Sequence, residues 1–112
     1  MPSTYVRRFN LKESLSDKQV NDFWKFLLGD FVPAIQKIKG VNSVRVYSGA
    51  GALRSDLRLV ADMDHAGVYE GLLREPSISK HLGKFYGAMD LQTSTQMFIR
   101  EVTPDLLKAL SS

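Results

Sequence analysis

The hydrophobic and polar residues of this chain repeat with two different periods. In the segment Thr4–Leu11, β-branched and aromatic residues follow one another without Gly or Pro, which is typical of a β-strand. Further along, apolar residues recur at steps of three and four, which places them in one stripe along a helix. The stripe consists of Val20, Phe23, Trp24, Leu27, Phe31, Ile35 and Ile38. The chain is therefore expected to begin with a strand followed by a long helix.

Local signals indicate where this helix begins, bends and ends. Ser16 and Gln19 have the spacing of a capping box, in which each side chain satisfies the backbone N–H of the other. Pro33 cannot donate a hydrogen bond to the carbonyl of Gly29, so a kink or break is expected between them. Gly40 can adopt the left-handed conformation that commonly ends a helix.

Two further strands, Val41–Ser48 and Arg54–Met63, flank the turn-rich segment 49–52 and are predicted to form a hairpin. The predicted register places Ser48 opposite Leu53. Because side chains alternate between the faces of a strand, this register sorts the residues into two groups. One face carries Val44, Val46, Leu57, Leu59 and Ala61. The other carries Arg45, Tyr47, Asp56, Arg58 and Val60, with Arg45 opposite Asp56 and Val44 opposite Leu57.

The remainder of the chain alternates between helix and strand signals. Asp64 is a suitable N-cap for a helix that ends at Glu75, since the residue before a proline is disfavoured in helical geometry. Ser77 is expected to cap a second, short helix with apolar residues at helical spacing. The segment Gln92–Val102 is predicted to be the fourth strand, and a terminal helix is predicted over residues 104–110.

The order strand, helix, strand, strand, helix, strand predicts a single α+β domain over residues 1–112 with the ferredoxin-like arrangement. In that arrangement the helices cover one face of a four-stranded antiparallel sheet and leave the other face open. The open face is too apolar for a monomer in water, which predicts that a second copy covers it and that the protein is a homodimer. Its predicted residues are Tyr47, Val60 and Phe98 among Arg45, Arg58, Gln96 and Arg100.

The composition narrows the function classes further. The chain has 44% hydrophobic residues, a formal net charge of +3 and no Cys, which excludes disulfides and cysteine metal sites. No segment approaches the about 18 apolar residues of a membrane span, and the first ten residues contain no secretory signal, so a cytoplasmic location is expected. Basic residues form no stripe, and no cofactor motif or metal-ligand spacing is present, so no nucleic acid, cofactor or metal is predicted.

The sequence resembles the dimeric α+β barrel superfamily, and the resemblance covers Thr4 to Val102. It is carried by the aromatic-rich first helix, by the breaks at Pro33 and Gly40 before the second strand, and by the helix exit Leu73–Pro76. Proteins of the antibiotic-biosynthesis-type monooxygenase, haem-degrading monooxygenase, muconolactone isomerase-like, ethyl tert-butyl ether degradation-type and stress-responsive groups look like this. The resemblance implies two ferredoxin-like subunits that face their sheets together.

The haem-degrading group uses an Asn near the end of the first strand, a Trp and a His. Asn10 and His81 stand at matching places in this sequence, but Trp24 lies on the first helix, where that group does not carry its Trp. This departure argues against haem degradation. The resemblance to the other groups implies a cofactor-independent monooxygenase or an isomerase-like enzyme that acts on a hydrophobic or aromatic metabolite.

Candidate site residues follow from these expectations. His81 is the candidate proton donor or acceptor, and its structural interpretation is a surface or capping histidine. Asn10 or an arginine is the candidate for oxyanion stabilisation. The candidate substrate-binding residues are Trp24, Phe85 and Tyr86 as pocket walls and Arg45, Tyr47 and Arg58 as an anion site. For these, core packing and a polar layer that fixes the strand register are the alternatives. A non-catalytic dimeric ligand-binding or stress-response module is the competing function.

Overall fold

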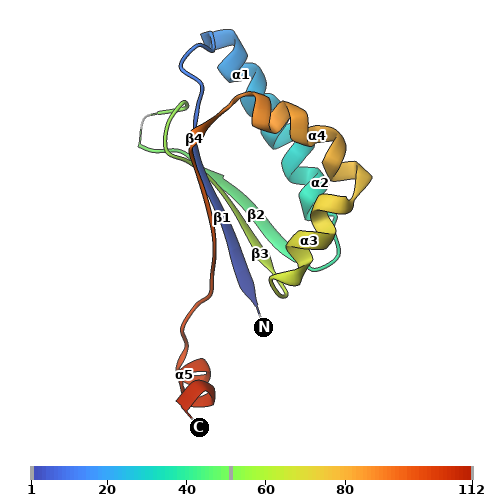
Figure 1. The fold of residues 1–112 in the computed structure, drawn as a ribbon, viewed down its shortest axis with the longest axis vertical. Coiled ribbons are helices and arrows are strands. Elements are labelled where there is room, and N and C mark those ends of the chain that lie inside the picture. Colours follow the sequence, from blue (N-terminus) through green and yellow to red (C-terminus); the bar gives the residue numbers. More distant parts are fainter. Residues whose placement is uncertain (1, 51, 112) are drawn as a thin grey trace.

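The computed structural model describes residues 2–50 and 52–111 and shows the predicted order of elements (Figure 1). The strands are β1 (Ser3–Leu11), β2 (Val41–Tyr47), β3 (Leu57–Met63) and β4 (Met89–Ile99). The helices are α1 (Asp17–Phe26), the π-helix η1 (Leu27–Phe31), α2 (Val32–Gln36), α3 (Gly67–Arg74), α4 (Pro76–Gly87) and α5 (Pro104–Ser111). The strands form one antiparallel sheet in the order β2-β3-β1-β4.

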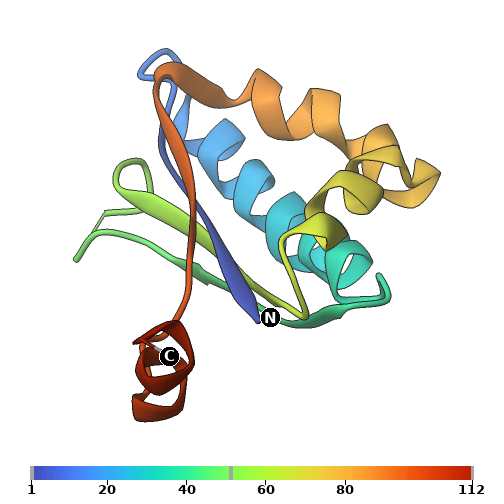
Figure 2. The same ribbon diagram turned by 60° about the horizontal axis from the view of Figure 1, so that its bottom comes forward.

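The helices α1 to α4 lie on one face of this sheet, and the other face is open (Figures 1 and 2). The core fills the space between the two layers, where the fully buried side chains include Phe9 of β1, Leu57 of β3 and Phe85 of α4. The rings of Phe9 and Phe85 meet edge to face with their centroids 5.5 Å apart. Burial of such aromatic side chains contributes on the order of 2–3 kcal/mol each and fixes the helices on the sheet.

The signals predicted around the first helix are confirmed. The Ser16 Oγ accepts a hydrogen bond from the Gln19 N–H at 3.2 Å, and the Gln19 Oε1 accepts one from the Ser16 N–H at 2.8 Å. The expected irregularity before Pro33 is the π-helix η1, after which α2 continues the apolar stripe. Gly40 has a φ of +96°, the left-handed value predicted for it.

The predicted register of the β2–β3 pair is wrong by four residues. Val44 lies opposite Ala61 and Arg45 lies opposite Val60, because β3 begins only at Leu57 and the connection is longer than a tight turn. A shift by an even number leaves every side chain on its predicted face, since the side-chain period is two. The two face assignments are therefore correct although the opposing pairs are not. Gly51 of the predicted turn lies outside the described residues.

The fourth strand differs from the prediction in its bounds and in its faces. It spans Met89–Ile99 and contains an irregularity where its pairing with β1 shifts between Arg8 and Asn10. Phe98 lies opposite Tyr5, and their ring centroids are 5.4 Å apart on the helical side of the sheet. The predictions that Phe98 and Gln96 belong to the open face are thus wrong. Because side chains alternate along a strand, an error of one residue in the predicted pairing assigns every side chain of that strand to the wrong face.

Two predicted helix caps are also wrong. The helix α3 begins at Gly67 without a side-chain cap, while the Asp64 Oδ1 accepts a hydrogen bond from the Asn42 Nδ2 at 3.0 Å. The helix α4 begins at Pro76, whose fixed φ suits the first helical position, so Ser77 lies inside the first turn. Among the described residues, no helix combines the length and the apolar character that crossing a membrane requires.

Candidate functional site

A small cavity lies between the sheet and the helices. It measures about 30 Å³, is partly open to solvent and is enclosed mainly by aliphatic and aromatic side chains of β1, β3, α3 and α4. A cavity of this size holds water, whereas a ring-sized ligand has to occupy its open mouth as well. Arg7 is the one charged residue in the described lining of the cavity. The chemistry of this place therefore depends on how Arg7 is held.

Arg7 is half-buried and donates four hydrogen bonds. Its Nε donates to the Tyr5 hydroxyl at 2.8 Å, and its Nη1 donates to the Ser94 hydroxyl at 2.8 Å. Its Nη2 donates to the Gln96 Oε1 at 2.7 Å and, over a longer distance of 3.3 Å, to the Tyr86 hydroxyl. The guanidinium also lies over the Tyr86 ring, 5.3 Å from its centroid. These contacts hold the guanidinium in one orientation.

We call this group the Arg7 cluster. Its members are Tyr5, Arg7, Tyr69, Tyr86, Ser94 and Gln96. They come from four elements. The strands β1 and β4 supply the guanidinium and most of its acceptors, while Tyr69 of α3 and Tyr86 of α4 reach the cluster from the helical layer. The site therefore exists only when the sheet and the helix pair are packed together.

The acceptors around Arg7 are all neutral. The four ion pairs of the described residues involve the other arginines Arg8, Arg45, Arg54 and Arg58. Burial lowers the pKa of Arg7, but its contacts with Tyr5 and Tyr86 raise this pKa by more, so the guanidinium keeps its charge. Burial raises the pKa of Tyr5, which therefore stays a neutral phenol.

A half-buried charge with neutral neighbours is unfavourable unless another group stabilises it. Here the hydrogen bonds orient the guanidinium and leave its net charge uncompensated in the lining of an apolar cavity. This combination suits a molecule with an apolar body and one anionic oxygen, because the body can contact the apolar walls of the cavity and of its opening while the oxygen meets the cation.

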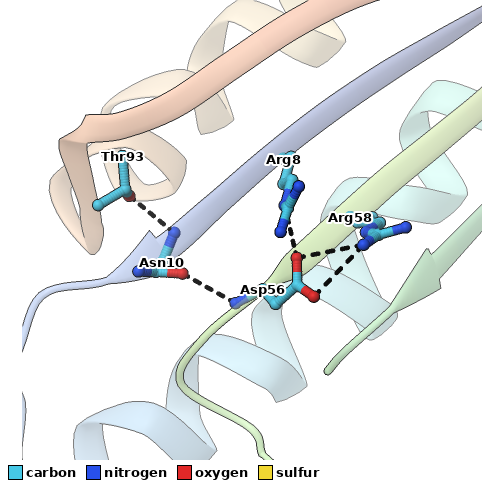
Figure 3. A network of polar contacts seen from close by, with 5 residues as sticks. All are labelled: Arg8, Asn10, Asp56, Arg58 and Thr93. Atoms are coloured by element: carbon cyan, nitrogen blue, oxygen red, sulfur yellow. Dashed lines mark hydrogen bonds and ion pairs between the residues drawn. The ribbon is translucent and has the colours of Figure 1, made fainter. Parts of the chain in front are cut away.

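A second polar group lies on the open face of the sheet (Figure 3). The Asp56 carboxylate accepts from the Arg8 Nε at 2.6 Å and from the Arg58 Nη2 at 3.3 Å. The Asn10 Oδ1 accepts from the Asp56 N–H at 2.8 Å, and the Asn10 N–H donates to the Thr93 hydroxyl at 2.9 Å. Desolvation raises the pKa of Asp56, but the two arginines lower it by more. This group is ion-paired internally, in contrast to Arg7.

The open face is also hollowed. A concavity of about 680 Å³ is bordered by Arg8, Tyr47, Arg58, Met97 and Ile99, among others. Met97 and Ile99 are each about half exposed, and Tyr47 is 46% exposed. The surface therefore mixes apolar side chains with the ion-paired group of Figure 3.

The structure separates the residues predicted for one site. Phe85 and Tyr86 line the cavity beside Arg7. His81 is half-buried on α4 and packs its ring edge to face against Phe26, with centroids 5.5 Å apart, outside the described lining of the cavity. The indole N–H of Trp24 donates to the Leu53 carbonyl at 2.9 Å and so lies against the β2–β3 connection.

The remaining predicted residues lie on the open face of the sheet. Asn10 and Arg58 belong to the group around Asp56, and Arg45 pairs with Asp62 at 3.3 Å. The structure therefore brings Phe85 and Tyr86 together with Arg7, and brings Tyr47 and Arg58 to one concavity. His81 contacts neither Asn10 nor Arg7 in the described structure and is outside the described lining of the cavity.

Sequence reasoning missed Tyr5, Arg7, Tyr69, Ser94 and Gln96. One signal was available for Arg7. It occupies the alternate position of β1 between the buried residues Tyr5 and Phe9, on the face that packs against the helices. A charged residue in the middle of a buried strand face needs an explanation, and a binding role is a physical one.

Comparison with known proteins identifies the fold. No protein-family model matches the sequence, and no curated protein matches it. Solved structures do match. SnoaB, a cofactor-independent oxygenase from Streptomyces nogalater, is 12% identical with a TM-score of 0.68, and the match covers 92% of this chain and 97% of SnoaB. The chain has the ferredoxin-like α+β fold.

Two other matches are similar in extent. A dimeric ferredoxin-like protein of unknown function from Thermobifida fusca is 16% identical with a TM-score of 0.70, covering 90% of this chain and 92% of that one. An ethyl tert-butyl ether degradation family protein from Bacillus halodurans is 20% identical with a TM-score of 0.61, covering 91% and 100%. At these identities the likeness establishes the ferredoxin-like fold.

Proposed function

We propose that this protein is a homodimeric α+β barrel enzyme that binds a small aromatic or enolic anion at the Arg7 cluster. One observation supports this most directly. The half-buried Arg7 guanidinium lines an apolar cavity and is held by neutral acceptors, and it forms no ion pair with the described residues. An apolar ligand with one anionic oxygen would supply the missing countercharge.

The reaction that this charge favours begins with loss of a proton from the ligand. A guanidinium close to a phenol or enol oxygen stabilises the anion and lowers the pKa of the ligand by about one unit or more. The anion of a quinol passes electrons to dioxygen much more readily than the neutral quinol does. Two electrons and two protons then move from hydroquinone to O₂, giving benzoquinone and hydrogen peroxide. SnoaB, described as a cofactor-independent oxygenase, has the same fold.

The homodimer in this proposal is supported by the open face of the sheet. This face carries Val6, Val60, Met97 and Ile99, and these apolar side chains border a wide concavity. Exposed apolar surface of this kind commonly marks a protein–protein interface. The Thermobifida fusca protein with this fold is described as dimeric.

A second candidate function is ligand binding without catalysis. It is favoured by the composition of the cavity, because its described lining includes no Asp, Glu or His that could accept the ligand's proton. In that case the anion would bind as it arrives from solution, and the protein would carry or sense it. Oxygen consumption distinguishes the two functions.

The binding part of the proposal can be tested with 4-nitrophenol, a single-ring phenol whose anion absorbs visible light that the neutral phenol does not absorb. Bound to the protein, its apparent pKa should fall by about one unit, because Arg7 stabilises the anion. Arg7→Gln should abolish this shift while keeping hydrogen-bonding groups in place. Arg74→Gln on the exposed surface of α3 is the matched control. An unchanged spectrum with the unmodified protein would refute anion binding at this cluster.

The catalytic part can be tested separately with an oxygen electrode. Hydroquinone with the unmodified protein should consume oxygen faster than hydroquinone alone, and Arg7→Gln should return the rate to the uncatalysed one. If 4-nitrophenol binds with a lowered pKa but oxygen consumption is unchanged, the second candidate function replaces the enzyme.

A further inference from the structure

The exposed apolar side chains are concentrated near one end of the described chain. Of the ten large hydrophobic side chains that are exposed in the described residues, six lie between positions 97 and 110. They are Met97, Phe98, Ile99, Val102, Leu107 and Leu110. Scattered exposed residues need no explanation, but a concentration of this kind indicates an interaction surface. We call residues 100–111, which include α5, the arm.

The helix α5 lacks the packing that usually stabilises so short a helix. It has eight residues and none of them is buried. Leu106 and Ala109 border a surface depression together with Pro2, while Leu107 and Leu110 remain 62% and 63% exposed. Isolated helices shorter than about 12 residues are marginal in water, so packing of an amphipathic side has to supply their stability. The apolar side of α5 is therefore expected to pack against another apolar surface.

The position of α5 indicates where this surface comes from. Figures 1 and 2 show α5 beyond the end of β4, on the opposite side of the sheet from α1 to α4. That is the side of the open face, to which β4 contributes Met97 and Ile99 directly before the arm begins. A molecule packed on the open face would therefore extend toward α5. Along the chain, exposed apolar side chains continue from Ile99 of β4 through Val102 to Leu107 of α5.

We propose that the arm packs against a second copy of this chain, with Leu107 and Leu110 in the contact. The inference rests on the proposed homodimer, because the copy that covers the open face is the copy that the arm meets. In a twofold dimer each arm then packs on the opposite subunit, so the contact occurs twice. The arms add two contacts outside the sheet-to-sheet interface.

Photo-crosslinking identifies what covers the arm. Full-length protein with p-benzoylphenylalanine in place of Leu107 should give, after irradiation, a product with the mass of two chains on a denaturing gel. The same group in place of Lys25, on the exposed side of α1, is the control and should give no such product. Adducts confined to single chains would show that α5 packs on its own subunit and would overturn the proposal.

Substitutions in the arm test the proposed arm contact separately from the proposed homodimer. Leu107→Glu combined with Leu110→Glu should raise the dissociation constant of the dimer at least tenfold, whereas Leu28→Glu, at an equally exposed leucine of η1, should leave it unchanged. If the unmodified protein is dimeric and the double variant dissociates no more readily, the arm proposal fails and the homodimer stands. If the unmodified protein is monomeric at all concentrations, both fail.

Discussion

The amide oxygen of Gln96 accepts hydrogen bonds from three donors at once. The Arg7 Nη2 lies 2.7 Å away, the Tyr5 hydroxyl 2.9 Å and the Tyr69 hydroxyl 3.3 Å. A carboxylate at this place would hold the same donors more strongly, but it would also neutralise the guanidinium. The neutral amide orients Arg7 and leaves its charge available to a ligand. Gln96 is thus a positioning residue in the proposed function.

Gln96→Glu tests this role. The new carboxylate should form an ion pair with Arg7, so the pKa shift of bound 4-nitrophenol should disappear and its affinity should fall at least tenfold. The melting temperature should stay the same or rise slightly, since the hydrogen bonds remain. Gln92→Glu, at an exposed position of the same strand, is the control and should change neither quantity. Unchanged affinity in Gln96→Glu would show that the charge of Arg7 is not what binds the anion.

The candidate site was only partly predictable from the sequence. Phe85 and Tyr86 were expected to line a pocket because they lie on an amphipathic helix, and they do line it. Arg7 and Gln96 could not be paired without the β1–β4 register, which sets them opposite each other. His81 shares its helix with Tyr86, but rotation around the helix axis places it against Phe26, outside the described lining of the cavity.

The Asp62 carboxylate connects three strands on the open face of the sheet. Asp62 of β3 accepts hydrogen bonds from the Ser43 hydroxyl of β2 at 2.6 Å and from the Thr4 hydroxyl of β1 at 2.7 Å. These bonds, from Ser43 first and then Thr4, hold the pKa of Asp62 below its ordinary value. Because the folded pKa is the lower one, this stabilisation is complete above the unfolded pKa of about 3.9 and is lost as the pH falls through the folded pKa.

Asp62→Asn should therefore lower the free energy of unfolding at neutral pH by about 1 kcal/mol, a modest loss because the carboxylate is partly solvated. The difference from the unmodified protein should shrink as the pH is lowered below about 4, where the native carboxylate takes up its proton. Denaturant unfolding at several pH values measures this. Asp22→Asn on the exposed side of α1 is the control. A stability difference that does not depend on pH would contradict the assignment.

The junction between α2 and β2 depends on a glycine. Gly40 has a φ of +96°, and a Cβ built on it would lie 2.7 Å from the Val68 Cγ2 of α3. Gly40→Ala should therefore lower the free energy of unfolding by about 2 kcal/mol or more, from backbone strain together with the collision. Gly71→Ala is the matched control, since its Cβ meets nothing within 4 Å, and it should stabilise α3 by about 0.5–1 kcal/mol. Thermal unfolding of both variants measures these changes in stability. A Gly40→Ala variant as stable as the unmodified protein would contradict the role of Gly40.

The sequence predicted the order of elements and the two faces of the β2–β3 pair. It did not predict the β2–β3 register or the faces of β4, and the structure explains why. Alternation along β2 and β3 survives a register error of four residues because four is even. In β4 the face of each residue depends on the pairing with β1, which sets Phe98 opposite Tyr5 and Gln96 opposite Arg7, so the predicted faces of Phe98 and Gln96 were wrong. Periodicity specifies which residues share a face, whereas register and parity depend on the neighbouring strand.

Considered as one molecule, the chain has two unequal faces. One face of the sheet is covered by the helices α1 to α4 (Figure 1), whereas the open face presents Val60 and Met97 around a concavity of about 680 Å³. The Arg7 cluster lies on the helical side and the ion-paired group of Figure 3 on the open side, so the proposed self-association and the proposed ligand binding would use different surfaces. This separation allows the two properties to be altered independently.

Met97→Lys should convert the dimer to a monomer. Met97 borders the concavity beside Arg8 and is 52% exposed, so a lysine is accommodated in the single chain but brings like charges together when two open faces meet. Light scattering should give the mass of one chain for this variant and of two for Leu28→Lys, the control at a leucine that is 56% exposed on the helical side. Near-native circular dichroism and an unaltered 4-nitrophenol spectrum should accompany the monomer, since the Arg7 cluster belongs to one subunit. A Met97→Lys protein that remains dimeric would show that the two copies associate through another surface.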